Sequence, residues 1–251
     1  MTPAEVPPCP VCSGKSRLFD MLDFNKICGP QDLHVPAPSG IAIYYALCKS
    51  CGFCFAPELL KWAHAQFAQH IYNDDYILVD PEYAAIRPRA FHHLLQQAFG
   101  EHASGFSHID YGGGNGTLAK MLCDTGWNSR SYDPFSNPDV NPDALGQFDL
   151  VTAFEVFEHV PDVHALMHRL TTLLKEDGVL FFATQLSDGQ ILPGQRLTWN
   201  YAAPRNGHIS LYCKASLEYV AKQYGFNLAS DWHSLHLMYR NKPAWAAKVL
   251  T

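Results

Sequence analysis

The sequence predicts an α/β fold, in which a doubly wound sheet with an antiparallel terminal hairpin follows a small cysteine-bearing module. From Phe106 onward, short apolar runs alternate with helical patterns, as they do in consecutive strand–helix–strand units with parallel strands. The last two apolar runs, residues 226–232 and 235–239, are separated by only two residues, which favours an antiparallel pair. Near the N-terminus, four of the eight cysteines form two C-x-x-C pairs, which indicate a separate small module.

The individual elements follow from their local patterns. Short apolar runs predict buried strands, and apolar residues three and four positions apart predict helices. The predicted strands are residues 107–111, 129–132, 148–154 and 178–184, and the predicted helices are residues 58–72, 88–99, 116–125, 162–175 and 214–224. We therefore expect three domains: the cysteine module over residues 1–57, a helical lid or connector over 58–100, and the main α/β domain over 101–251.

Charge and hydropathy exclude several classes of protein. The chain of 251 residues has 18 Lys and Arg against 24 Asp and Glu, so it lacks the excess positive charge that binding to a phosphate backbone uses. Nucleic acid is therefore an unlikely partner. No stretch is long and apolar enough for a membrane span or a secretory signal, so we expect a cytoplasmic protein without membrane contact. The oligomeric state is left open.

The two C-x-x-C pairs predict a zinc ribbon. Cys9 with Cys12 and Cys48 with Cys51 supply two knuckles, and four thiolates complete a tetrahedral structural zinc site. The intervening residues 13–47 are then an inserted loop. The alternatives are inert buried thiols or a redox dithiol, but the redox reading requires a βαβ context that this proline-rich N-terminus lacks.

A glycine-rich turn at the first strand-to-helix junction predicts a nucleoside site. Gly112, Gly114 and Gly116 permit positive φ and let the backbone approach a ligand closely. About seventeen residues later, Asp133 ends the next predicted strand, where a carboxylate accepts hydrogen bonds from both ribose hydroxyls.

Asp110, two residues before Gly112, discriminates between two cofactors. The glycine pattern alone also fits a dinucleotide. A carboxylate at residue 110 suits a cationic or amino-bearing ligand and repels pyrophosphate. S-adenosylmethionine has a sulfonium and an amino group but no phosphate, so Asp110 favours it; the alternative role for Asp110 is that of a turn or helix-capping residue.

These motifs together resemble those of class I S-adenosylmethionine-dependent methyltransferases, which have a Rossmann-like sheet. The resemblance covers roughly residues 75–240 and comprises D-x-G-x-G-x-G at 110–116, S-Y-D-P around Asp133, the segment 148–162, the strand 178–184 and N-G-H-I-S at 206–210. It implies that Gly112, Gly114 and Gly116 line the methionine and ribose, that Asp133 holds the ribose, and that Phe154 lies beside the methyl-bearing sulfur. The family often has a further strand and helix where this chain has only residues 134–147.

Acidic and histidine side chains follow the strand 148–154. Glu155, Glu158 and His159 stand at the carboxyl end of this strand, where open α/β sheets bind their ligands. The pattern is similar to the E-x-x-E-H motif of coenzyme Q and small-RNA O-methyltransferases, in which a downstream histidine, here His208, joins a divalent-metal site. Three interpretations stay open: a second site for Mg²⁺ or another divalent cation, acid–base catalysis by His208 or, second, by His159, and a structural role.

We therefore expect methyl transfer from S-adenosylmethionine to oxygen, carbon or nitrogen of a small molecule, in natural-product or cofactor biosynthesis. The alternatives are an NAD(P)-dependent oxidoreductase and a non-catalytic zinc-module binding protein with a degenerate cofactor site. The remaining histidines, among them His92, His93, His233 and His236, lack a partner pattern and are expected on helix or strand surfaces.

Overall fold

The computed structural model describes residues 6–29, 36–247 and 249–250. Within it the chain forms two compact units, each composed of several segments. The first unit comprises residues 1–81, 158–163 and 185–220, and the second comprises residues 82–157, 164–184 and 221–251. Residues 1–5 and 30–35 of the predicted cysteine module lie outside the described residues. The three-domain division at residues 57 and 100 stays a prediction.

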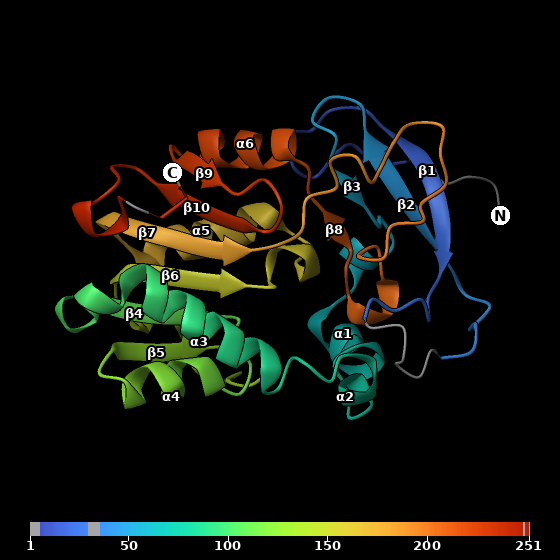
Figure 1. The fold of residues 1–251 in the computed structure, drawn as a ribbon. Coiled ribbons are helices and arrows are strands. Elements are labelled where there is room, and N and C mark those ends of the chain that lie inside the picture. Colours follow the sequence, from blue (N-terminus) through green and yellow to red (C-terminus); the bar gives the residue numbers. More distant parts are fainter. Residues whose placement is uncertain (1–5, 30–35, 248, 251) are drawn as a thin grey trace. The chain divides into compact units, whose positions relative to one another are not determined.

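The second unit is built around one mixed sheet (Figure 1). Its strand order is β5-β4-β6-β7-β10-β9. The first four strands are parallel to one another, and β10 pairs antiparallel with both β7 and β9. The strands are β4 (Ser107–Tyr111), β5 (Asn128–Tyr132), β6 (Phe148–Phe154), β7 (Leu174–Ala183), β9 (Asn227–Ser230) and β10 (Leu235–Tyr239). The predicted fold class and terminal hairpin are confirmed.

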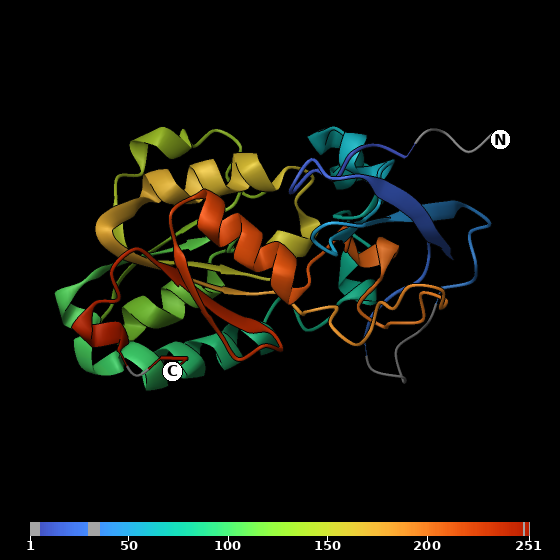
Figure 2. The ribbon, with the colours of Figure 1, turned by 90° about the horizontal axis from the view of Figure 1, so that it is seen from above.

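Helices cover both faces of this sheet. The helices of the second unit are α3 (Ile86–Phe99), α4 (Thr117–Asp124) and α5 (Val163–Leu173, of which Val163 belongs to the first unit), whereas most of α6 (Lys214–Gln223) belongs to the first unit. Figures 1 and 2 show α3 and α4 side by side on one face and α5 on the other. Among the described residues, no helix has the length and apolar character needed to cross a lipid bilayer.

Aromatic packing dominates the core beneath α3. The ring of Phe99 meets those of Phe106, Phe181 and Trp245 edge-on, at centroid distances of 6.4, 5.8 and 5.5 Å. Rings in this arrangement bring a positive edge against a negative face, which adds to the gain from burial.

The segment 134–147, too short for another strand and helix, contains only a 3-10 helix, Pro142–Ala144. The sheet therefore ends at β5.

The first unit contains a four-stranded antiparallel sheet of order β1-β2-β3-β8. Its strands are β1 (Ser16–Asp23), β2 (Ala42–Cys48), β3 (Cys54–Phe55) and β8 (Ser210–Leu211). The last strand comes from a distant part of the sequence, since Cys54 pairs with Leu211 and Phe55 with Ser210. This pairing could not be predicted, because a two-residue strand is too short to have a detectable periodicity.

The expected single helix over residues 58–72 is wrong. A 3-10 turn at Leu59–Lys61 is followed by extended backbone at Trp62 and Ala63, and α1 begins only at His64 and ends at His70. At this break the ring of Trp62 packs against Phe24 and Phe67, with centroid distances of 6.1 and 5.5 Å, a contact that accompanies the extended backbone. A short helix α2 (Tyr76–Val79) follows.

Candidate functional site

The glycine turn has the backbone conformation that its sequence predicts. The φ values at Gly112, Gly114 and Gly116 are 75°, 55° and 78°. Residues that have a Cβ rarely adopt such positive φ values. At Gly112 an added Cβ would lie 2.5 Å from Cγ2 of Val156, so space as well as conformation requires glycine there. The turn thus exposes backbone directly after β4, before α4 begins.

Asp133 lies where β5 ends and is tied to the glycine turn. The backbone N–H of Gly114 donates to its Oδ2 at 3.2 Å. The N–H groups of Phe135 and Ser136 donate to Oδ1 at 2.8 and 2.9 Å. These bonds fix the carboxylate in one orientation, and the remaining lone pair, on Oδ2, is available to a ligand hydroxyl.

Asp110 is buried at the end of β4. The Thr152 hydroxyl on β6 donates to its Oδ1 at 2.7 Å. Burial raises the pKa of Asp110 to about 7, the Thr152 hydrogen bond opposes that rise, and the charge of Asp133 adds to it. A cation bound nearby would favour the ionised form of Asp110.

The fully buried side chain of His108 on β4 connects β5 and β6 through hydrogen bonds. His108 Nδ1 lies 2.8 Å from Ser129 Oγ on β5, and its Nε2 lies 3.0 Å from Thr152 Oγ1. Burial lowers the pKa of His108 to about 3, so the ring is neutral and one nitrogen donates while the other accepts. Since Thr152 donates to Asp110, His108 Nε2 is the donor to Thr152 and Ser129 donates to Nδ1. This series of hydrogen bonds could not be predicted from the sequence, because a single histidine inside an apolar strand belongs to no recognisable motif.

Phe154, which the resemblance places beside the methyl-bearing sulfur, packs in the core of the second unit, and its place beside the cofactor stays a prediction. Its ring stacks on Phe91 at a centroid distance of 4.1 Å and meets Phe181 edge-on at 5.5 Å. Only 8% of the residue is exposed.

Three of the four residues of the expected divalent site come together in the first unit. Glu158, His159 and His208 have candidate ligand atoms within 4.8 Å of one another, and both Glu158 and His208 are buried. The 3-10 helix Phe157–His159 carries the first two, and His208 immediately precedes Ile209, whose N–H donates to the Glu158 carbonyl at 2.9 Å. Backbone pairing therefore sets the spacing of these side chains.

Glu155 belongs to the second unit and has a different partner. Its Oε2 lies 3.8 Å from Nη1 of Arg87. Glu155 also has a φ of 53°, an uncommon conformation for a non-glycine residue, and its N–H donates to the Ala183 carbonyl at 3.0 Å. The cluster of candidate ligands thus consists of Glu158, His159 and His208.

Tyr201 connects two members of this cluster, and sequence reasoning did not single it out. Its hydroxyl donates to Glu158 Oε1, and its backbone carbonyl lies 2.6 Å from His208 Nδ1. Because a carbonyl only accepts, Nδ1 carries the hydrogen and Nε2 is left as a lone pair. His208 is therefore arranged as a base or a ligand through Nε2.

Gly207 allows this cluster to be compact. It has a φ of 86°, and an added Cβ would lie 2.9 Å from Tyr72 Oη and 3.1 Å from His159 Nδ1. Its position requires both the left-handed backbone and the missing side chain.

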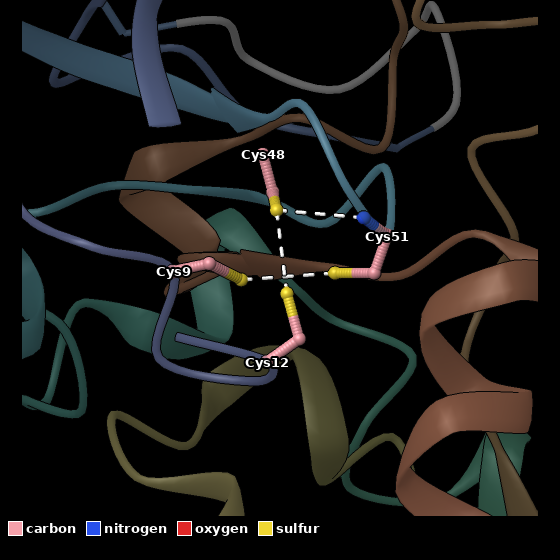
Figure 3. A group of neighbouring side chains, drawn as sticks. All are labelled: Cys9, Cys12, Cys48 and Cys51. Carbon is pink, nitrogen blue, oxygen red and sulfur yellow. Dashed lines mark hydrogen bonds between the residues drawn. The ribbon is translucent and has the colours of Figure 1, made fainter. Parts of the chain in front are cut away.

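The four predicted zinc ligands gather at one point, with their sulfurs directed toward a common centre (Figure 3). Cys9 Sγ lies 3.7 Å from Cys51 Sγ, and Cys12 Sγ lies 3.5 Å from Cys48 Sγ. Ser50 and Cys51 donate backbone N–H groups to Cys48 Sγ at 3.3 and 3.5 Å.

The other cysteines of this unit lie outside the four-sulfur cluster. Cys54 is fully buried in β3. Cys213 Sγ donates to the Cys51 carbonyl at 3.0 Å, and Cys28 Sγ lies 3.9 Å from His208 Nδ1.

His236 contradicts the expectation of a surface histidine. It is fully buried, with Nδ1 at 2.8 Å from Ser230 Oγ and Nε2 at 2.9 Å from the Thr184 carbonyl. The two partners satisfy both ring nitrogens, which explains how the hairpin accommodates a polar ring.

The strand order, the glycine turn and Asp133 define the second unit as a nucleoside-binding α/β domain. The family described as "Methyltransferase domain" matches residues 83–231, more than half of the chain. The chain belongs to this methyltransferase family, and its sequence-based identification as a class I S-adenosylmethionine-dependent methyltransferase is confirmed at the level of the family.

Curated relatives match over shorter stretches. A ubiquinone biosynthesis O-methyltransferase of Erwinia tasmaniensis is 30% identical over 110 residues, covering 34% of this chain and 45% of that protein. Its counterpart in Glaesserella parasuis is 50% identical over 38 residues, covering 15% of this chain and 16% of that protein. The chain thus spans less than half the length of these relatives.

Solved structures are also similar. The 1,6-didemethyltoxoflavin-N1-methyltransferase of Burkholderia thailandensis is 16% identical, with a TM-score of 0.49, over 78% of this chain and 98% of that one. The magnesium protoporphyrin IX methyltransferase of Synechocystis PCC 6803 is 14% identical, with a TM-score of 0.42, over 72% of this chain and 95% of that one.

Proposed function

We propose that the chain transfers a methyl group from S-adenosylmethionine to an oxygen of a small-molecule acceptor. The observation that carries this proposal is the hydrogen bond between His208 Nδ1 and the Tyr201 carbonyl, which leaves Nε2 able to take a proton. A hydroxyl acceptor must lose its proton as the methyl group arrives, whereas the sulfonium needs no activation. Partial similarity to ubiquinone biosynthesis O-methyltransferases supports oxygen over carbon or nitrogen.

The second unit would bind the cofactor. Asp133 would accept hydrogen bonds from the ribose hydroxyls, and the turn at Gly112, Gly114 and Gly116 would lie against the methionine and ribose. Asp110, when ionised, would attract the amino group. These residues align the activated methyl group, which is the main contribution that such an enzyme makes besides proton removal.

His208 is the proposed general base, and His159 is the second candidate. A positioned base typically contributes about 10² to 10⁴-fold to the rate. The two rings lie close to each other, with centroids 4.9 Å apart. Because Tyr201 holds His208 Nδ1–H, the ring can accept a proton only at Nε2, and the resulting imidazolium keeps its hydrogen bond.

The same cluster has the donor set of a divalent-cation site. Glu158 Oε2 is buried and has no hydrogen-bond partner among the described residues. A buried carboxylate oxygen without a partner is costly, and a cation would satisfy it. Glu158, His159 and His208 would hold the cation, and one carboxylate with two imidazoles suits Mn²⁺, Fe²⁺ or Zn²⁺ better than Mg²⁺. Such an ion would increase the acidity of a hydroxyl bound to it.

We further propose that Cys9, Cys12, Cys48 and Cys51 bind one structural Zn²⁺. The support is their common centre, and four thiolates would leave no open position for a substrate.

Ligand binding tests the cofactor assignment. We expect S-adenosylhomocysteine, at about 100 times its dissociation constant, to stabilise the protein by about 2.7 kcal/mol in thermal unfolding, and NAD and NADP to have no effect. Stabilisation by NAD alone would overturn the assignment. Screening candidate acceptors with methyl-labelled S-adenosylmethionine would then identify the acceptor and, by analysis of the product, the methylated atom.

Dialysis separates the two roles of the cluster. If a cation takes part, dialysis against a chelator abolishes turnover and added Mn²⁺ restores it, while the thiolate-bound zinc stays in place. If His208 acts alone, turnover persists after dialysis. In both cases His208→Ala loses about 10² to 10⁴-fold in kcat, and His233→Ala, at an exposed histidine, keeps full activity. Full activity of His208→Ala would overturn both roles.

A further inference from the structure

Lys26 contacts the loop that carries Tyr201. Its ammonium donates to the carbonyls of Trp199 and Asn200 at 2.9 and 3.2 Å and also to the carbonyl of Ala202. An ammonium has three N–H donors, so all of them are used on this loop.

Of the four successive carbonyls of residues 199–202, Lys26 binds three, and the fourth is that of Tyr201. It is the carbonyl at 2.6 Å from His208 Nδ1. Four successive peptide groups, residues 199–202, therefore have their oxygens divided between one ammonium and one imidazole. Since neighbouring peptide planes are coupled through φ and ψ, fixing three of these oxygens restricts the direction of the fourth.

The backbone around Lys26 also holds the end of this loop. The Lys26 carbonyl accepts the N–H of Arg205 at 3.2 Å. Two residues further on, the N–H of Cys28 donates to Asn206 Oδ1 at 2.9 Å. Burial lowers the pKa of Lys26, but its three acceptors are all oxygen dipoles that favour the charged form.

We propose that Lys26 is a positioning residue that orients the Tyr201 carbonyl and thereby fixes His208 as the Nδ1–H tautomer. The importance of this tautomer for catalysis depends on the proposed function of His208. The contacts of the Lys26 ammonium with this loop are all to backbone carbonyls, so its effect would pass through the backbone of residues 199–202.

The tautomer can be measured without an activity assay. In protein with ¹⁵N-labelled histidine, His208 is assigned as the ring signal that His208→Gln removes. At a pH where the ring is neutral, we expect wild-type His208 to show a protonated Nδ1 and an unprotonated Nε2. In Lys26→Met the ring should shift toward the Nε2–H tautomer, and Lys26→Arg, which keeps the charge and the donors, should restore part of the wild-type signal. Lys61→Met, at an exposed lysine of the same unit, should leave the spectrum unchanged.

Kinetics then relate the tautomer to the reaction. We expect Lys26→Met to lower kcat by about 10- to 100-fold, less than the loss of the base itself, with little change in the affinity for S-adenosylhomocysteine. A wild-type His208 that is not Nδ1–H overturns the proposal whether or not the variant folds. A Lys26→Met variant that keeps the Nδ1–H tautomer also overturns it. A changed tautomer with unchanged kcat supports the positioning role and contradicts the function proposed for His208.

Discussion

The hydroxyl of Tyr45, on β2 of the first unit, donates a hydrogen bond of 2.8 Å to the backbone carbonyl of His208. Tyr45 is fully buried, and β2 ends at the zinc-ligand candidate Cys48. The strand that leads to the cysteine cluster therefore also supports the histidine that we propose as the base. If His208 is the base, as we propose, this contact would connect the cysteine module to the chemistry, even though four thiolates would leave no open position for a substrate.

Loss of zinc should consequently reduce turnover. Cys48→Ser should release the ion and loosen β2, because metal binding and folding of such modules are coupled. We expect elemental analysis to find one zinc per chain in the wild type and in Cys123→Ser, a matched change at an exposed thiol, but none in Cys48→Ser. Wild-type protein that is purified without chelator and has no zinc would rule out the metal site.

Asp133→Ala should weaken binding of S-adenosylhomocysteine by about 1.5–3 kcal/mol, the range for a hydrogen bond to a charged group. That corresponds to roughly 10- to 150-fold in the dissociation constant, measured by calorimetry. Asp139→Ala changes an exposed carboxylate in the loop that follows and should bind normally. Equal affinities in two folded variants would contradict the ribose assignment.

Gly207→Ala tests the close approach in the candidate cluster, with Gly194→Ala as its control. The two glycines have nearly equal φ values, 86° and 85°, but an added Cβ at Gly194 meets nothing within 4 Å. Both variants should lose about 1–2 kcal/mol of unfolding free energy because of the left-handed backbone. Only Gly207→Ala should also lose activity, since its methyl group would displace Tyr72 or His159. Similar kinetics in both variants would show that the contact is unimportant.

The pKa of Asp110 makes stability depend on pH. Burial raises this pKa from 3.8 to about 7, so between these values the folded protein binds a proton that the unfolded chain has released. The contribution is therefore fully present below pH 3.8 and is lost as pH rises toward about 7. Asp110→Asn, which is never charged, should have a smaller loss of stability across this range in chemical denaturation.

The same titration predicts pH-dependent binding. An amino-bearing ligand favours ionised Asp110, so affinity for S-adenosylhomocysteine should increase as pH rises through about 7 in the wild type. Asp110→Asn should bind more weakly at pH 8 and lose this increase. A pH-independent affinity in the wild type would argue against a direct role of Asp110 in binding.

Much of the fold could be predicted because its signals are local. The glycines of the turn, the apolar run of β6 and the short link between β9 and β10 each specify a structure within a few residues. The cysteine cluster was equally predictable, since Cys9 with Cys12 and Cys48 with Cys51 form two C-x-x-C motifs, a spacing typical of metal sites.

The supporting contacts of the candidate site could not be predicted in this way. Lys26 and Trp199, or Tyr45 and His208, are far apart in sequence, and neither pair belongs to a motif. His108 and His236 are buried because hydroxyl and carbonyl partners satisfy them, and these partners come from other strands. The position of such groups depends on tertiary pairing, which a single sequence does not reveal.

The pairing of β3 with β8 has a consequence for the order of folding. Cys54 is synthesised long before Leu211, and the strands β4 to β7 lie between them in the sequence. On the ribosome, all four thiols of the proposed zinc site therefore emerge well before the edge strand that completes their sheet. Domains generally form as units while the chain is synthesised. The four-stranded sheet of the first unit, however, can be completed only after residues 210 and 211 have been synthesised. A nascent chain that stops at β7 should hold zinc less tightly than the finished protein, and loading of the metal should be completed only late in synthesis or after release.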